Sequence, residues 1–404
     1  MPATTAVARL IEQGVIIPDP AQVWIDDAVD LARIAAPGAV FYPGCRIRGA
    51  RTFIAAAARL GEAGPVTVCD SLIGPGAAVQ GGYCSGAVLL AGACLGPEAH
   101  VRAGTILEEQ AGTAHSVGLK QTILFPFVIL GSLINFCDVL MTGGTGRDSH
   151  SEVGSSYIHF NFTPHQDKAT ASLLGDVPAG VMLDQAPIFL GGQGGLVGPC
   201  RLGFGTVAAA GTIVRKDELR PNRLIAGGAA RPLNIPRRLD APRTLPRILG
   251  NNLIFIGNLF ALRSWYREVR RRFIGPDFPA ALYQGAATNI DGAIEERIAR
   301  LEQLCGQQAG KGAEENLRDA CEAWPATADL LAEFQRETVE IAPPAEVFLS
   351  RLEQVRKACG NAYLETIRSL APETRRRGTA WLQGIVDVVV ALASGPLGLK
   401  NGKI

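Results

Sequence analysis

Apolar residues recur at every sixth position along three separate stretches of the chain. They are Ile54, Leu60, Val66 and Leu72, then Leu89, Leu95, Val101 and Leu107, and later Leu190, Leu196, Leu202, Ala208 and Val214. A period of six fits neither an α-helix, which repeats about every 3.6 residues, nor a single strand, which repeats about every two. It fits a coil with three flat sides, in which each hexad supplies one short strand and one corner. The pattern therefore predicts a parallel β-helix of hexapeptide repeats whose recurring apolar residue points inward.

The amino-acid composition agrees with such a coil. The chain of 404 residues contains 47 Gly but only 15 Phe, 6 Tyr and 4 Trp. Glycine suits corners that need a positive φ angle or a close backbone approach, and a narrow prism leaves little room for aromatic rings. No Gly-x-y repeat is present, which excludes collagen, and a hydrophobic share of 47% excludes a disordered chain.

The charge balance and the apolar runs exclude several classes of partner. With 39 Lys and Arg against 38 Asp and Glu, the chain lacks the basic excess of a nucleic-acid-binding protein. The longest apolar run, 384–393, contains Asp387 and is too short to cross a bilayer, and residues 1–20 lack the features of a signal peptide. The nine cysteines form no CxxC motif. We therefore expect a cytoplasmic protein with reduced thiols, no membrane span and no nucleic-acid partner.

The six-residue period ends near two prolines, Pro232 and Pro236. Beyond them, apolar residues follow helical spacing over several segments that Gly and Pro separate. We therefore expect a β-helix domain over residues 1–230 and an all-α C-terminal domain over residues 231–404. The basic, aromatic-bearing stretch Arg263–Arg272 is interpreted as a solvated or interface surface, with contact to a nucleotide or phosphate as the less favoured alternative. Residues 276–404 show no evident chemistry, and a role in oligomerisation or as a lid is the default hypothesis for them.

Five segments carry a more specific signal than the hexads. They are Gly14-Val15 with Asp19-Pro20, Leu95–Gly104, Val117–Gln121, Val153–Phe162 and Phe189–Asp217. In this order they resemble the acetyltransferase half of the bifunctional bacterial glucosamine-1-phosphate acetyltransferase / N-acetylglucosamine-1-phosphate uridyltransferase family, over about residues 8–220. The resemblance implies a mainly β fold, a left-handed β-helix, and a homotrimer with clefts between its subunits. Because few residues precede the β-helix, we expect no uridyltransferase activity.

The resemblance also implies roles for particular side chains. The family holds the sugar phosphate with an arginine and a lysine that correspond to Arg102 and Lys120, and two cations suit a dianionic phosphate. The family's asparagine, which helps to hold the substrate amide and the acetyl donor, corresponds to Asn161. The predicted substrate-binding residues are Arg102, Lys120, Asn135, Asn161 and Lys168. Gln193 and Arg215, in the last coils, are predicted to contact the cofactor, acetyl-CoA or another acyl-CoA.

The chain departs from the family at the catalytic base. The family's histidine and tyrosine correspond to Ser132 and Asn135, and a serine hydroxyl does not by itself deprotonate an amine. In a regular coil, the residue one turn after Ser132 is His150, unless the glycine-rich stretch 141–150 forms a loop and breaks the register. His150 and His165 are therefore the candidate catalytic bases.

These observations predict a hexapeptide-repeat transferase that acts on a phosphorylated sugar or a nucleotide-sugar, such as UDP-N-acetylglucosamine. Acyl-CoA-dependent acyl transfer at a site between subunits is the expected reaction. Three alternatives stay open. The trimer could bind a sugar nucleotide without catalysis, since Ser132 replaces the base, or the polar side chains could merely cap turns and pack subunit contacts. A metal enzyme is the third alternative, with His150, His159 and His165 as ligands, although their spacing departs from the usual ligand pattern.

Overall fold

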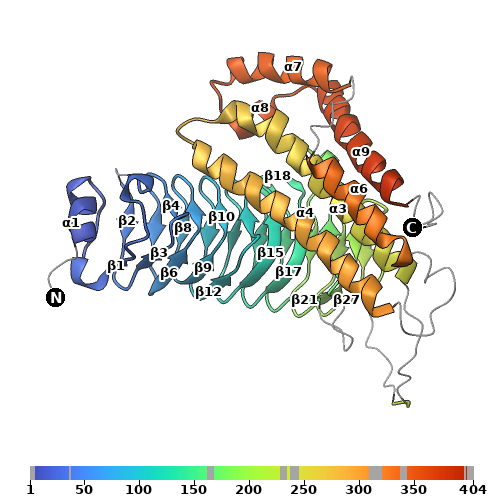
Figure 1. The fold of residues 1–404 in the computed structure, drawn as a ribbon, viewed down its shortest axis with the longest axis horizontal. Helices are drawn as coiled ribbons and strands as arrows, with labels where there is room; N and C mark the ends of the chain where they lie inside the picture. The colour runs from blue at the N-terminus through green and yellow to red at the C-terminus, as the bar shows by residue number, and fades with distance from the viewer. Residues whose placement is uncertain are drawn as a thin grey trace.

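The chain forms a parallel β-helix followed by a set of α-helices, as the sequence predicts (Figure 1). The structure, a computed structural model, describes residues 5–35, 38–161, 168–227, 234–236, 245–308, 321–336, 344–394 and 397. Helix α1 (Thr5–Glu12) lies at the N-terminal end of the coils, where its Val7 and Leu10 are buried. The left-handed β-helix of hexapeptide repeats and the all-α region after it are confirmed, whereas the domain boundary at residue 230 remains a prediction.

Three flat sides make up the β-helix, and we name two of them by what lies against them. The open face consists of β1 (Trp24–Ile25), β3 (Arg46–Arg48), β6 (Val66–Cys69), β9 (Gly82–Ser85), β12 (Ala99–Val101), β21 (Ile158–Phe160), β24 (Gly195–Val197) and β27 (Ile213–Val214). The covered face consists of β4 (Phe53–Ile54), β7 (Leu72–Ile73), β10 (Val88–Leu89), β13 (Ile106–Leu107), β22 (Ser172–Leu174) and β25 (Arg201–Leu202). Two longer strands, β15 (Gly118–Leu124) and β17 (Asn135–Met141), turn the corner and belong to both faces.

The third face is a ten-stranded ladder along the same axis. Its strands are β2 (Val40–Phe41), β5 (Arg59–Leu60), β8 (Ala78–Val79), β11 (Cys94–Leu95), β14 (Gly112–Thr113), β16 (Ile129–Leu130), β20 (Glu152–Val153), β23 (Phe189–Leu190), β26 (Val207–Ala208) and β28 (Leu224–Ile225). On all three faces each strand pairs in parallel with the strand of the neighbouring coil. Side chains that share a register position therefore form straight rows along the prism.

Inward-pointing aliphatic side chains fill the prism. Val101 and Leu107 are fully buried, as the six-residue period predicts. Leu72 differs, because its neighbour Ile73 takes the inward position. Leu72 points outward and lies against Gly285, where an added Cβ would come within 2.7 Å of its Cδ2. At β7 the inward position is therefore one residue later than the six-residue period predicts.

Left-handed backbone conformations mark the corners between faces. The composition predicts glycine or alanine there, but the corner between the third and open faces carries larger residues. They are Glu98 (φ 57°), Ser116 (56°), Leu133 (60°), Ser156 (62°) and Gln193 (53°). The Leu133 N–H donates to His115 O at 3.1 Å and the Ser156 N–H donates to Ser132 O at 2.8 Å. Because such bonds from neighbouring coils hold the backbone, the corners tolerate side chains where glycine was expected.

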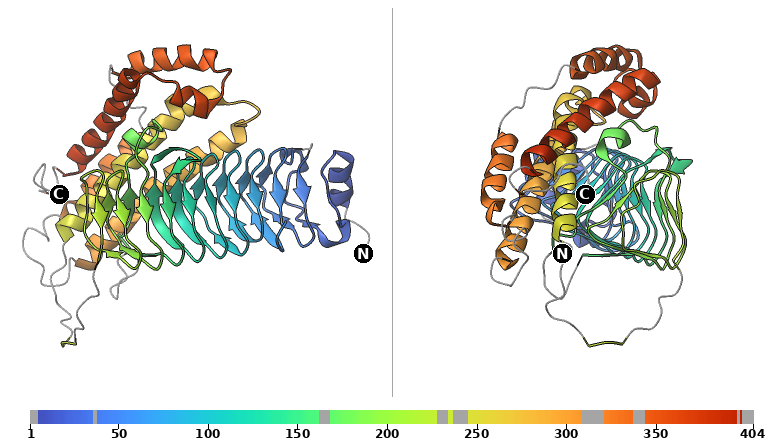
Figure 2. Two further views of the ribbon diagram at one scale, coloured as in Figure 1. Left: turned by 180° about the vertical axis from the view of Figure 1, so that it is seen from behind. Right: turned by 90° about the vertical axis from the view of Figure 1, so that its right-hand side faces the viewer.

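The helices after residue 244 lie along one side of the coils and extend above them (Figure 2). They are α3 (Leu245–Glu268), η3 (Arg270–Phe273), α4 (Ala280–Gln308), α6 (Trp324–Arg336), α7 (Pro344–Ala358), α8 (Tyr363–Arg368) and α9 (Pro372–Ser394). α3 packs against α4 and α9, and α4 contacts β7 and β10 of the covered face. The helices therefore cover one face of the three.

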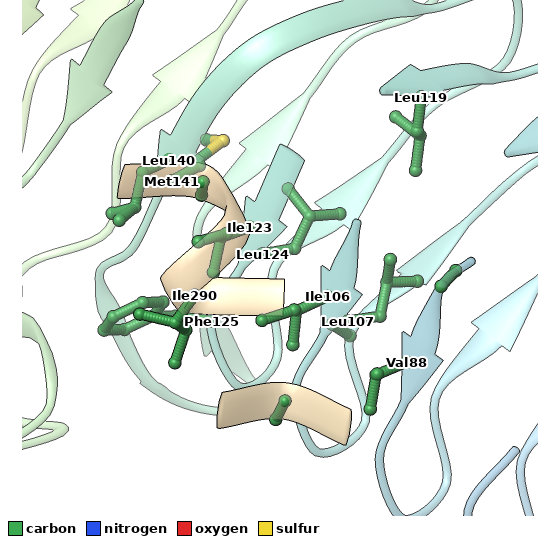
Figure 3. Packing of buried hydrophobic residues seen from close by; sticks show 14 of the residues in the cluster. Val88, Ile106, Leu107, Leu119, Ile123, Leu124, Phe125, Leu140, Met141 and Ile290 are labelled. Carbon is green, nitrogen blue, oxygen red and sulfur yellow. The ribbon is translucent and has the colours of Figure 1, made fainter. Parts of the chain in front are cut away.

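Apolar side chains point outward from the covered face and explain why α4 lies there. They are Phe53, Leu72, Val88, Ile106 and Ile123, which the strand register aligns on successive coils. Ile290 of α4 lies close to Ile123 and Phe125 (Figure 3). Burying one such side chain contributes about 1.5–3 kcal/mol. The row as a whole therefore favours a helix on this face over solvent.

Polar side chains also tie the helices to the coils. Arg270 is fully buried and pairs with Glu109. The Tyr266 hydroxyl donates to Glu108 Oε1 at 2.7 Å. Among the roles expected for the basic stretch Arg263–Arg272, Tyr266 and Arg270 take the interface role, because their partners lie in the coils.

One segment among the described residues, Leu245–Phe273, is long and apolar enough to cross a bilayer, and its most apolar 18-residue window has a mean hydropathy of 1.2. Its most apolar window is 78% buried inside the protein, which is the pattern of a core helix.

Candidate functional site

Two cations meet at the corner between the open and covered faces, which we name the Cys137 corner. Arg102 follows β12, Lys120 lies in β15 and Cys137 lies in β17, on three successive coils. The strand register places Lys120 beside Cys137, and Arg102 Nη2 lies 3.7 Å from Cys137 Sγ. The structure thus brings together the two side chains that the sequence predicts to bind a phosphate.

The Cys137 thiol stays protonated despite these cations. Burial is the main cause that raises the pKa of Cys137, and the Asp138 carboxylate raises it further, whereas Arg102 and Lys120 lower it. A neutral thiol neutralises neither cation. The positive charges of Arg102 and Lys120 therefore remain available to an anion.

Asp138 would repel an anion at this corner, but a helix supplies its counter-charge. Arg297 of α4 donates to Asp138 Oδ1 at 2.7 Å, and both side chains are almost fully buried. Arg297 lies in the C-terminal region, where the sequence shows no evident chemistry, and it was not among the predicted site residues. No local pattern marks it, because its partner lies 159 residues away along the chain.

His159 lies beneath the same corner and is not a free base. Its Nδ1 lies 2.6 Å from Cys137 O, and its Nε2 lies 2.8 Å from Ser172 Oγ. Burial lowers the pKa of His159 to about 4, so the ring is neutral near physiological pH. Because both ring nitrogens have hydrogen-bond partners, His159 does not offer an open ligand position to a metal. The residues that the structure describes contain no group of three His, Cys, Asp or Glu side chains that could hold a metal ion.

Asn135 occupies the open face next to the Cys137 corner. It pairs in register with Gly118 on the coil before, where an added Cβ would lie 3.7 Å from Asn135 Oδ1. The glycine therefore leaves the amide free of a neighbouring side chain on that side. Asn135 is three residues from Ser132 and two from Cys137, which is a reach of about 10 Å or less at about 3.3 Å per residue. The amide thus lies between two corners of the prism.

The second of these corners, between the third and open faces, holds a contact that the sequence analysis missed. We name it the His115 corner, because His115 Nδ1 lies 2.8 Å from Ser132 Oγ there. The Ser132 N–H donates to Ser155 Oγ at 3.3 Å, and Ser116 Oγ donates to Glu98 Oε2 at 2.7 Å. His115 is exposed and Ser132 is half-buried. The spacing of 17 residues, close to one coil turn, was the available signal.

His150 does not lie one coil above Ser132. The glycine-rich stretch forms a hairpin of β18 (Gly144–Gly146) and β19 (Ser149–His150) in place of a regular coil. The position above Ser132 is taken by Ser155, as their hydrogen bond shows. Of the two alternatives that the sequence left open, the structure shows the loop that breaks the register, because the hairpin adds residues to this turn. The role of His150 as a base remains a prediction.

The ring of His150 is held within its own hairpin. Its Nδ1 lies 2.7 Å from Arg147 O, and its Nε2 lies 3.8 Å from Glu152 Oε2. The side chain is partly buried and keeps limited contact with solvent. His165, the other predicted base, lies outside the described residues.

Gln193, a predicted cofactor-binding residue, lies at the His115 corner. Its N–H donates to Ser155 O at 2.8 Å. The glycines around it form tight corners, since an added Cβ at Gly191 would lie 2.4 Å from Ala210 N. Ser132 and Gln193, a predicted cofactor-binding residue, therefore lie along the same corner of the coils.

Three further predicted residues lie at other places on the coils. Asn161 directly follows β21, and its carbonyl accepts a hydrogen bond from Thr170 Oγ1 at 3.3 Å. Lys168 and Arg215 are exposed. No contact joins these three side chains to the Cys137 corner in the described part of the chain, so their binding roles remain predictions.

Comparison with known proteins agrees with the motifs. The chain is 29% identical over 209 residues to the bifunctional protein GlmU of Kineococcus radiotolerans, which covers 52% of this chain and 38% of the relative. It is 30% identical over 219 residues to GlmU of Clavibacter sepedonicus (53% and 39%) and 26% identical over 215 residues to GlmU of Thermotoga maritima (52% and 42%). The resemblance to the β-helix domain of this family is confirmed. No family model matches the chain.

The similarity is partial in two respects. The chain spans 38–42% of the length of these relatives. A crystal structure of Arabidopsis UDP-N-acetylglucosamine acyltransferase aligns over 81% of this chain and 96% of its own, at 15% identity and a TM-score of 0.18. That TM-score is too low to support any statement about this chain.

Proposed function

We propose that the chain is a hexapeptide-repeat transferase that binds a phosphorylated sugar or a nucleotide-sugar on its open face and transfers an acyl group to it from an acyl-CoA. The observation that carries the proposal is the meeting of Arg102 and Lys120 beside the neutral Cys137. An arginine fork and a lysine point charge together suit a dianionic phosphate. The similarity to the bifunctional protein GlmU supports a transferase.

The remaining polar groups fit the other parts of such a substrate. Asn135 has both a donor and an acceptor to offer to sugar hydroxyls between the two corners. Asn161 and Lys168 keep their predicted roles in substrate binding, and Gln193 and Arg215 keep theirs on the acyl-CoA side. Acetyl-CoA or another acyl-CoA would supply the activated thioester.

The catalytic base is a separate part of the proposal. His150 and His165 are the bases that the sequence predicts. If one of them is the base, its replacement by Gln lowers turnover while leaving the stabilisation by acetyl-CoA intact, because a base acts in the chemical step and not in cofactor binding. Unchanged turnover in both variants would require another base.

We further propose that the protein is a homotrimer with its sites between subunits. Its proposed location is the cytoplasm. Exposed apolar side chains on the two faces without helices support it. They are Ile158, Phe160, Phe189, Val207 and Ile213, each 38–41% exposed. Contact between copies would bury these side chains. Light scattering would test the proposal by giving the mass of three chains.

A thermal-shift titration tests the binding step directly. Acetyl-CoA, glucosamine 1-phosphate and UDP-N-acetylglucosamine are titrated separately, and at least one phosphorylated sugar is expected to raise the melting temperature. Arg102→Gln and Lys120→Gln are expected to weaken that ligand about tenfold each, because each removes a charge-assisted bond. Arg46→Gln is the matched control, since Arg46 is an exposed arginine on the same face. Equal weakening by Arg46→Gln would refute the proposed site.

A non-catalytic sugar-nucleotide-binding protein is the second candidate, and Ser132 favours it. Such a protein keeps the two cations and has no need of a base. It would be stabilised by UDP-N-acetylglucosamine, yet it would release no CoA from acetyl-CoA with any amino sugar.

A further inference from the structure

An imidazole stands beside the position at which the family's histidine is missing. His115 Nδ1 lies 2.8 Å from Ser132 Oγ, and the two residues come from neighbouring coils. We propose that His115 is the general base of the acyl transfer and that Ser132 is the positioning residue that holds its ring. The inference rests on the function proposed above and names the group that performs its chemical step.

The backbone fixes both partners of this contact. The Leu133 N–H donates to His115 O at 3.1 Å, and the Ser132 N–H donates to Ser155 Oγ at 3.3 Å. The coils before and after Ser132 are therefore locked in register at this corner. A histidine held in this way needs little reorganisation before it reacts, which is the requirement for an effective base.

The hydrogen bond to Ser132 also sets the tautomer. When Nδ1–H donates to Ser132 Oγ, Nε2 carries the lone pair. Because the His115 side chain is exposed, the substrate that receives the acyl group can reach Nε2. Ser132 thus has a function that a serine can perform, although it cannot act as the base.

The proton balance of the step is complete. The acceptor's amine or hydroxyl gives its proton to His115 Nε2 while its heteroatom attacks the thioester carbonyl carbon. The carbon–sulfur bond then breaks, and the departing CoA thiolate takes the proton from Nε2. The base returns to its neutral form with no other reactant required.

The other described histidines are less suited to this role. His159 is buried with both nitrogens bonded, and His150 is held in the hairpin. His100 stacks on the Tyr83 ring, with 5.2 Å between ring centres. The one carboxylate known to lie at the His115 corner, that of Glu98, accepts from Ser116.

Steady-state kinetics on the full chain test the assignment. CoA release from acetyl-CoA is measured with glucosamine 1-phosphate as acceptor. His115→Gln is expected to lower kcat about 100-fold or more, with KM for acetyl-CoA unchanged. Ser132→Ala is expected to lower kcat several-fold, whereas Ser132→Thr, which keeps the hydroxyl, stays near wild type. Ser116→Ala is the matched control, because Ser116 lies at the same corner and bonds Glu98.

A double variant gives an independent readout. Ser132→His combined with His115→Gln moves the imidazole to the family's position, and it is expected to recover much of the activity that His115→Gln loses. An active wild type with an equally active His115→Gln variant would overturn this inference alone. A wild type that is stabilised by acetyl-CoA but releases no CoA would refute the proposed acyl transfer, and this inference with it.

Discussion

The covered and open faces are built from one repeat, yet their outward rows carry opposite chemistry. The covered row is Phe53, Leu72, Val88, Ile106 and Ile123. From β3 to β17 the open row is Arg46, Thr67, Tyr83, His100, Gly118 and Asn135, and beyond this stretch it becomes apolar at Trp24 and Ile158. Inward positions are buried and mostly aliphatic on both faces, with Phe136 and His159 as exceptions on the open face, and they make the coil. Outward positions decide what each face contacts, so the apolar covered row binds helices and the polar stretch of the open row from β3 to β17 is left for solvent or ligand.

The arginines on the two faces also differ in their partners. Beneath the helices, Arg270 and Arg297 are each paired with a carboxylate of the coils. At the Cys137 corner, Arg102 contacts a neutral thiol instead. A buried arginine needs its counter-ion for stability, whereas an accessible arginine beside a neutral group is suited to binding an anion.

The largest expected effect is on the covered side. Arg270→Ala should lower the free energy of unfolding by about 3–5 kcal/mol, because it leaves the Glu109 carboxylate buried without its counter-charge. Urea denaturation measures the change. Arg271→Ala, at an exposed position of the same helical turn, should change stability by less than about 0.5 kcal/mol. Equal losses would show that burial does not distinguish the two arginines.

Neighbouring positions of one coil give a second comparison. Ile106→Ala should cost about 2–5 kcal/mol, because it opens a cavity between the coil and α4. His100→Ala, on the open face of the same coil, should cost less than about 1 kcal/mol, since His100 is exposed. Urea denaturation at one pH measures both, and a larger loss for His100→Ala would contradict the assignment of the two faces.

Stability should also depend on pH through the covered side. Burial, with Glu109 nearby, raises the pKa of Glu108 to about 7, while Arg270 and Tyr266 oppose the rise. Between its ordinary value of 4.5 and about 7, folded Glu108 holds a proton that the unfolded chain has lost. The free energy of unfolding should therefore fall by about 1–3 kcal/mol as pH rises through this window.

Glu108→Gln provides the control for that pH dependence. The amide keeps the shape of the carboxylic acid and cannot ionise, so the loss between about pH 5 and about pH 8 should largely disappear. Chemical denaturation at several pH values measures it. A variant with the same slope as the wild type would assign the dependence to other groups.

The smallest expected effect concerns binding at the Cys137 corner. Arg297→Gln should weaken the phosphorylated sugar about three- to tenfold, because the Asp138 charge is no longer compensated. Arg297→Gln combined with Asp138→Asn should restore the affinity. Calorimetry on the folded variants measures both, with Arg300→Gln on the same helix as control. Unchanged affinity in the single variant would mean that α4 does not influence the corner.

Much of the fold was predictable, because the six-residue period reports the inward positions directly. Val101 and Leu107 are buried as expected. Arg102 and Lys120 lie close together because they occupy equivalent positions on adjacent coils. The register failed where the sequence leaves the period. Leu72 turns outward, and the hairpin displaces His150 from the position above Ser132. A period predicts positions only while each coil has the same length.

The sequence by itself determined the coil, its inward rows and the two cations on neighbouring coils, since these depend on local spacing. Only the tertiary structure decided which face the helices cover, that Arg297 neutralises Asp138, and that His115 reaches Ser132. Those contacts join residues from different coils or from distant parts of the chain. The spacing of 17 residues allows the His115–Ser132 contact, but its geometry depends on the exact length of each turn. The Arg297–Asp138 contact depends on helix packing, which no local pattern encodes.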